Sequence, residues 1–182
     1  QLARDLDYTP GALYWYYPSK EALLVEVQRR AFTELADKIS AASRVWNARA
    51  DAAGLDPVAH SLHGLLAHAR YYLELGRTEP QYARLIAFSL DPRVWLDDAS
   101  AAQLTEVLAH VFTQVAAPFE TAQACRALRE GNGAVRAVQY WATLQGSLQV
   151  GKLQRISPEL FDGVALGTDS ARALLLGWGA DP

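Results

Sequence analysis

Apolar residues recur at helical spacing along most of the chain, and this pattern constrains the fold more than any other feature. Between Ser19 and Trp46 they return every three or four residues over about seven turns, at Leu23, Leu24, Val27, Ala31, Leu35 and Ile39. No stretch shows the apolar–polar alternation of a strand bounded by turn residues. The sequence therefore predicts an all-α protein.

Caps and prolines divide this pattern into separate helices. Residues 1–7 resemble the end of a helix, and Thr9-Pro10 starts a short one. That helix must end near Pro18, because proline disfavours helical backbone in the residue before it. Ser19 is expected to cap a long helix that ends near Trp46. Further helices are expected over residues 57–76, 79–90, 100–129 with a kink at Pro118, 134–154 and 170–178.

Composition excludes several classes of protein. Hydrophobic residues make up 51% of the 182 and charged residues 20%, which is typical of a globular chain and not of a disordered one. The single cysteine, Cys125, allows no internal disulfide, and no apolar run is long enough to span a membrane. We therefore expect a cytoplasmic protein without a membrane partner. Because methionine is absent, we expect the natural N-terminus to precede residue 1.

The residue patterns of common catalytic and cofactor sites are missing from the sequence, so we expect neither an enzyme nor a cofactor. It contains no nucleophile elbow, phosphate-binding loop or dinucleotide fingerprint. His60, His63 and His68 lie close in sequence, but only the first two are expected to share a helix face, which is a weak basis for a metal site. Cys125 is expected to be a small core residue.

The segment "TPGALYWYYPSKEALL", residues 9–24, places a short aromatic helix directly before the long one. Together with the helix end at residues 1–7, this gives the layout of a helix-turn-helix unit and the helix that follows it. The residues "LARDLDYTPGALYWYYPSKEALL" resemble the recognition segment of the TetR/AcrR family of bacterial transcriptional regulators. The positions that carry the resemblance are Leu2-Ala3, Thr9, Gly11, Leu13-Tyr14, Tyr16-Tyr17, Ser19-Lys20-Glu21 and Leu23.

The chain also departs from the family's pattern. Asp7-Tyr8 stands where the family usually has Gly-Val, and the first helix of the family's DNA-binding head has no counterpart, so the resemblance is to an N-terminally truncated member. Basic and acidic side chains balance over residues 1–30, which is weak for a DNA-binding surface. An alternative function is therefore a helical small-molecule sensor or binding protein whose head no longer binds DNA.

The resemblance implies two domains and a regulatory function. Residues 1–30 would form an incomplete helix-turn-helix DNA-binding domain, and residues 31–182 a helical ligand-binding and dimerisation domain. The protein would be a repressor that a small, mostly apolar effector releases from operator DNA. The short helix has free N–H groups that suit phosphate, and hydroxyl and aromatic side chains surround it. The expected DNA-binding residues are Thr9, Pro10, Gly11, Ala12, Tyr14, Trp15, Tyr16 and Lys20; for Trp15, packing within the head is an equal alternative.

Aromatic residues spread over the later helices suit a ligand cavity, because Tyr and Trp offer both apolar faces and polar groups. The expected ligand-binding residues are Tyr72, Trp95, His110, Phe112, Phe119, Tyr140 and Trp141, with His68, Gln114 and Gln145 as further polar candidates. A close-packed aromatic core without a cavity is the alternative.

Apolar stripes on the last two long helices predict a homodimer, because a monomer would expose them. The expected interface residues are Val138, Leu144, Leu148, Leu174, Leu175 and Trp178, and Gly146 and Gly151 would allow close helix approach. The sequence leaves open how residues 134–154 divide between the cavity and the interface.

Overall fold

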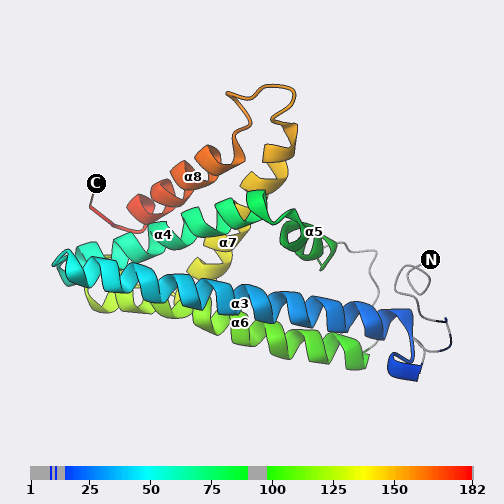
Figure 1. Cartoon of the computed structure of the whole chain (residues 1–182). Helices are drawn as coiled ribbons and strands as arrows, with labels where there is room; N and C mark the ends of the chain where they lie inside the picture. Colours follow the sequence, from blue (N-terminus) through cyan, green and yellow to red (C-terminus); the bar gives the residue numbers. More distant parts are fainter. Residues whose placement is uncertain (1–8, 10, 12–14, 90–97, 182) are drawn as a thin grey trace.

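The computed structural model describes residues 9, 11, 15–89 and 98–181 (Figure 1). Within helices, a few further side chains fall outside this description, including those of Phe88 and His110. The elements are α3 (Lys20–Ala52), α4 (Pro57–Thr78), α5 (Pro80–Ser89), α6 (Asp98–Ala124), α7 (Gly133–Val150), the 3₁₀ turn η1 (Gly151–Leu153) and α8 (Gly163–Gly177). The described residues contain no strand, and the all-α prediction is confirmed.

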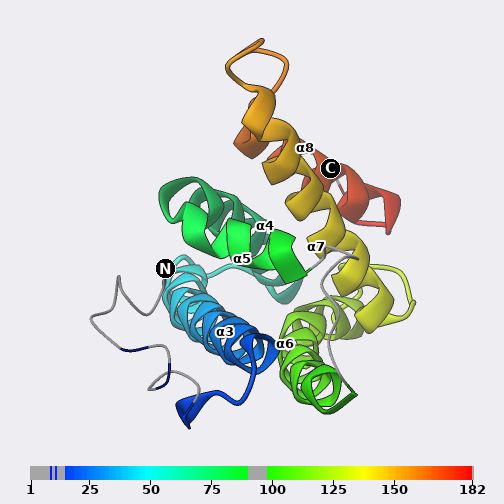
Figure 2. The same cartoon turned by 90° about the vertical axis from the view of Figure 1, so that its right-hand side faces the viewer.

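Helix α4 lies at the centre of the body. It contacts α3, α5, α6, α7 and α8, and the longest helices, α3 and α6, run side by side along one face (Figures 1 and 2). The side of α4 that faces these neighbours carries Leu65, Ala69, Tyr72 and Leu73, all buried. They join one core with Phe119 of α6, Tyr140 and Leu144 of α7, and Leu175 of α8. Burial of this apolar surface holds the helices together.

Helix α3 begins at the predicted cap and runs further than predicted. The Ser19 hydroxyl accepts a hydrogen bond of 3.0 Å from the backbone N–H of Ala22. The helix continues past Trp46 to Ala52, because the segment "NARADA" contains three alanines and one arginine, which are good helix formers. Gly54 then adopts a φ of 66°, a left-handed conformation that glycine accepts without strain and that ends the helix. Helix α3 crosses residue 30 without a break, so the predicted domain division lies inside one helix.

Helix α6 ends earlier than predicted, at Ala124 and not near Arg129. Arg126 has a φ of 63°, and the backbone N–H of Leu128 reaches back 3.0 Å to the carbonyl of Ala122. This bond satisfies a carbonyl that the ending helix leaves free. Pro118 lies inside α6, which the structure records as one continuous helix.

Helix α8 begins at Gly163, seven residues before its predicted start, and Asp162 caps it by accepting hydrogen bonds from Val164 and Ala165. The sequence did not predict this start because Gly163 and Gly167 have low helix propensity. Gly163 is required because backbone atoms approach it closely, whereas Gly167 lies against the movable end of the Leu73 side chain. A Cβ on Gly163 would come within 2.8 Å of the Ser147 carbonyl oxygen, and one on Gly167 within 2.6 Å of Leu73. None of the described helices is long and apolar enough to cross a membrane.

Candidate functional site

The described part of the N-terminal segment presents aromatic side chains to solvent. Trp15 is 80% exposed and Tyr16 is 64% exposed, with their rings in an edge-to-face contact at 4.9 Å. The structure therefore shows Trp15 largely free of packing within this chain. Thr9, Gly11 and Lys20 are exposed as well. The predicted contacts Pro10, Ala12 and Tyr14 lie outside the described residues.

Near the start of α3, the carboxylate of Glu26 forms ion pairs with two arginine side chains. Glu26 accepts from Arg29 at 2.7 Å and from Arg30 at 2.5 Å. The hydrogen bonds from Arg29, and then those from Arg30, lower the pKa of Glu26 to about 2. Glu26 therefore stays ionised and offsets part of the positive charge of these two arginines.

An inner cavity of about 170 Å³ lies between α3, α4, α6 and α7, with Ile86 of α5 at its edge. Four predicted ligand-binding residues line it: Tyr72, Phe112, Tyr140 and Trp141. Phe119 does not. It is 1% exposed and packs edge-to-face against Tyr140 at 5.3 Å and Trp178 at 5.7 Å, so its assignment to the ligand site is corrected to the core. Trp95 and the His110 side chain lie outside the described residues.

Most of the remaining cavity wall is aliphatic, and no sequence pattern specifically predicted it. Helix α3 contributes Phe32, Leu35 and Ile39, and α6 contributes Leu108, Val111 and Val115. Leu35 and Ile39 belong to the apolar stripe that predicted α3, but helical periodicity does not distinguish a side chain in a close-packed core from one beside a cavity.

A buried chain of hydrogen bonds fixes one side of this cavity. The Trp141 indole N–H donates to the Tyr72 hydroxyl at 3.0 Å, and that hydroxyl donates to Gln145 Oε1 at 2.9 Å. The Tyr140 hydroxyl donates to the Leu65 carbonyl at 2.9 Å. Burial raises the pKa of both tyrosines, so they remain neutral hydrogen-bonding groups. Gln145 does not line the inner cavity. It reaches the site only through Tyr72.

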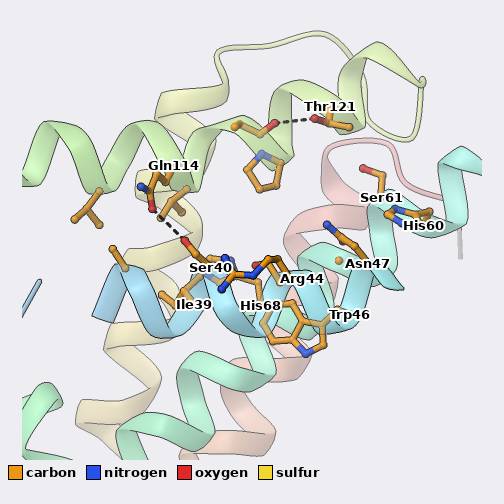
Figure 3. A pocket seen from close by; sticks show the side chains of 17 residues that line it. Ile39, Ser40, Arg44, Trp46, Asn47, His60, Ser61, His68, Gln114 and Thr121 are labelled. Atoms are coloured by element: carbon orange, nitrogen blue, oxygen red, sulfur yellow. Dashed lines mark hydrogen bonds between the residues drawn. The ribbon is translucent and has the colours of Figure 1, made fainter. Parts of the chain in front are cut away.

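A larger outer groove of about 560 Å³ adjoins the inner cavity between α3, α4 and α6 (Figure 3). Ile39, His68, Val111 and Val115 line both spaces. The outer groove is more polar, and Ser40 of α3 donates a long hydrogen bond of 3.4 Å across it to Gln114 of α6 (Figure 3). The predicted polar candidates His68 and Gln114 thus lie at this groove.

The prediction placed His60 and His63 on one face of α4 and His68 off it, but the structure groups His60 with His68. His60 and His68 line the outer groove, whereas His63 is exposed and borders a separate groove beside α8. The ring of His60 lies 3.3 Å from Asp51. Desolvation by burial lowers the pKa of His68 to about 4, so His68 is neutral at physiological pH. Among the described residues, no group of three or more His, Cys, Asp or Glu side chains is placed to hold a metal ion.

The predicted dimer residues lie on α7 and α8 and at the end of α8, mostly on the sides that face the core of the same chain. Leu144 and Leu175 are 1% and 3% exposed within one chain, so the structure assigns them to the core and corrects the prediction. Leu148 packs against Gly76, and Trp178 packs against Phe119. Leu174 is half-buried against the core, and only Val138 is exposed. The sequence pattern does not show which side of α7 faces the core, because α7 carries apolar residues on both sides.

The outward side of α7 is also apolar. Val135, Val138, Ala142, Gly146 and Val150 follow one another every three or four residues, and all are exposed. We call these five residues the outer stripe. A Cβ added to Gly146 would meet nothing within 4 Å, so this position is open to close approach by another helix.

A comparison with protein-family models matched residues 1–27 to the family described as bacterial regulatory proteins, tetR family. The matched segment includes the exposed aromatic residues and the first turns of α3. A search of curated proteins and a search of solved structures found no match for the chain. The N-terminal segment, residues 1–27, is thus similar to the tetR family of bacterial regulatory proteins.

Proposed function

We propose that the protein is a dimeric, cytoplasmic repressor that a small, mostly apolar effector releases from operator DNA. The continuity of α3 carries this proposal. The matched regulatory segment ends inside α3, and the same helix continues to Phe32, Leu35 and Ile39 in the wall of the inner cavity. One rigid element thus joins the DNA-reading segment to the ligand cavity, and a ligand that displaces the cavity wall tilts it.

The inner cavity supports a ligand-binding role rather than an enzymatic one. Its wall is almost wholly apolar, with a few polar groups from His68, Tyr72 and Trp141. Cavities of this composition bind small molecules through apolar burial, while the few polar groups orient the ligand. Effector binding shifts the protein between DNA-bound and free states only by its differential affinity for the two, typically about 1–3 kcal/mol.

The outer stripe supports the dimer. An exposed row of valines, alanine and glycine along one helix costs hydrophobic free energy in a monomer and is typical of an interaction surface. Two copies of α7, with α8 beside each, would cover it around a two-fold axis. Such a dimer presents two DNA-reading segments, as helix-turn-helix proteins that read two half-sites require.

The alternative is a sensor whose head does not bind DNA, and the pairing of Arg29 and Arg30 with Glu26 favours it. Selection of duplexes from a random pool by the full-length protein, followed by an electrophoretic shift assay, separates the two functions. A repressor is expected to enrich a two-fold sequence and shift it. Failure to enrich any sequence at low salt would exclude the DNA-binding function.

Ligand release is tested with a variant that fills the cavity. Val111 borders both the inner cavity and the outer groove, so Val111→Phe is expected to abolish the release of selected DNA by apolar compounds and to preserve DNA binding. Val45→Phe adds the same volume at an exposed position on α3 and is expected to respond like the parent protein. Equal release in both variants would contradict a ligand site in this cavity.

A further inference from the structure

The inner cavity and the outer groove differ in chemistry although they adjoin. Their shared boundary is one layer of side chains, formed by Ile39 of α3, His68 of α4, and Val111 and Val115 of α6. On the inner side the wall is aromatic and aliphatic. On the outer side it carries hydroxyl, amide and guanidinium groups (Figure 3). A molecule that occupied both spaces would need one apolar part and one polar part.

The charge of the outer groove is positive and uncompensated. Arg44 is the single permanently charged side chain among the described residues that line the two spaces, and no Asp or Glu lines either one. The described residues form no ion pair with Arg44, in contrast to Arg29, Arg30 and Arg77, which each have a carboxylate partner. An anion next to Arg44 would supply the missing partner, whereas a cation would meet repulsion and no acidic side chain.

Neighbouring groups on α3 complete a binding site for an anion. Ser40, Arg44 and Asn47 lie four and three residues apart, which places them on one face of the helix, and all three line the groove (Figure 3). An arginine guanidinium can donate two parallel hydrogen bonds to a carboxylate, and serine and asparagine can donate further ones. The histidines add little charge here, since His68 is neutral at physiological pH and His60 contacts Asp51.

We propose that the effector is an anionic amphiphile, a small carboxylate whose apolar part fills the inner cavity and whose carboxylate binds Arg44 in the outer groove. This inference rests on the proposed function, because it names the chemical class of the effector. The inner volume of about 170 Å³ sets the size of the apolar part. An apolar cavity of about 150 Å³ accommodates a benzene ring, so a single ring or a short branched chain fits.

The position of the carboxylate also explains how such a ligand would act on α3. The seam between α3 and α6 is bridged by the long Ser40–Gln114 hydrogen bond and closed beneath by Ile39, Val111 and Val115. A molecule that reaches from the inner cavity to Arg44 passes between these side chains and separates the two helices. An apolar molecule confined to the inner cavity acts on the inner wall alone and leaves the Ser40–Gln114 bridge in place.

Calorimetric titration with phenylbutyrate, phenylbutanol and phenylbutylamine tests the inference. These probes share a phenyl ring and a four-carbon chain, and their terminal groups are negative, neutral and positive. The full-length protein is expected to bind phenylbutyrate at least about tenfold more tightly than phenylbutanol, and phenylbutylamine most weakly. Arg44→Gln is expected to weaken phenylbutyrate binding about tenfold and to leave phenylbutanol unchanged. Arg49→Gln is the matched control, since Arg49 is an exposed arginine of α3 that lines a different groove.

Three outcomes overturn the inference: equal affinity for the acid and the alcohol, an equal loss in Arg44→Gln and Arg49→Gln, or no binding of any of the three probes. These results are distinguishable from failure of the proposed function. If apolar compounds still release selected DNA in a Val111-dependent manner, the proposed function stands and only the anionic class of effector is wrong. Circular dichroism of each variant verifies that the helical fold is intact.

Discussion

The indole N–H of Trp141 on α7 donates a 3.0 Å hydrogen bond to the hydroxyl of Tyr72 on α4, beside the inner cavity. Tyr72 donates in turn to Gln145 Oε1 at 2.9 Å, and both Tyr72 and Gln145 are buried. This hydroxyl thus pairs with one half-buried and one buried polar group, and it ties the central helix to the helix that carries the outer stripe.

Replacement of Tyr72 by phenylalanine is expected to destabilise the fold by about 1–3 kcal/mol, because it leaves the Trp141 N–H and Gln145 Oε1 without their partner. Urea denaturation measures this loss as a lower transition midpoint. Tyr71→Phe is the control: Tyr71 is the next residue on α4, half-buried, and packs its ring against Trp46 at 5.6 Å. Equal stability of the two variants would show that the hydrogen-bond chain contributes nothing.

Stability is expected to fall with acidification because of His68. Burial lowers its pKa in the folded protein from 6.5 to about 4, so the unfolded chain takes up a proton at higher pH than the folded protein does. The free energy of unfolding therefore decreases as the pH falls from about 6.5 to about 4, by at most about 3 kcal/mol. His68 is only half-buried by the side chains around it, and water in the adjoining groove would make the effect smaller.

Denaturation of His68→Gln over the same pH range tests this origin. The variant is expected to lose the His68 part of the pH dependence, whereas His63→Gln, at an exposed position of the same helix, should retain it. A pH profile identical to that of the parent protein would show that His68 titrates normally in the folded state.

Gly146→Arg is expected to convert the dimer to a monomer. The position is open within the protomer, so arginine fits the isolated chain but blocks a partner helix on the outer stripe. Sedimentation at micromolar concentration should give about twice 20.0 kDa for the parent protein and 20.0 kDa for the variant. Ala41→Arg, at an exposed site on α3, should remain dimeric. A dimeric Gly146→Arg protein would place the interface elsewhere.

Lys20→Ala is expected to weaken binding to all DNA sequences alike. Lys20 is exposed at the first position of α3, where a phosphate contact releases counterions, so its loss should flatten the dependence of log K on log salt by about one unit. Fluorescence anisotropy over a salt series measures the slope, with Lys152→Ala as a control far along the chain in η1. A changed sequence preference with an unchanged slope would mean that Lys20 reads bases.

The sequence predicted the features of this fold that local rules determine. Ser19 caps α3 as expected, because its side-chain oxygen can accept a hydrogen bond from a free backbone N–H group in the first turn of the helix. The start of α8 was missed because Gly163 and Gly167 disfavour helix locally, and only the close approach of the Ser147 backbone explains Gly163. Tertiary contacts of this kind are invisible in a helical pattern.

The candidate site was predictable only in part, for a related reason. Tyr72 and Trp141 were identified as cavity residues because their side chains combine apolar and polar groups. Phe119 has the same aromatic character but packs into the core, and the contribution of α3 to the cavity depends on how helices cross. Arg44 carried no signal at all, since an exposed arginine on a helix is ordinary until the structure shows the carboxylate-free groove beside it.

The most direct test of the account is the affinity of the dimer for phenylbutyrate, measured by calorimetry with and without the selected DNA duplex. If α3 couples the two sites, DNA must weaken phenylbutyrate binding by the same factor by which phenylbutyrate weakens DNA binding, because linkage is reciprocal. The account predicts a factor of about 5–150 in both directions, from a coupling of about 1–3 kcal/mol. Equal affinity with and without DNA would contradict it, even if phenylbutyrate binds tightly.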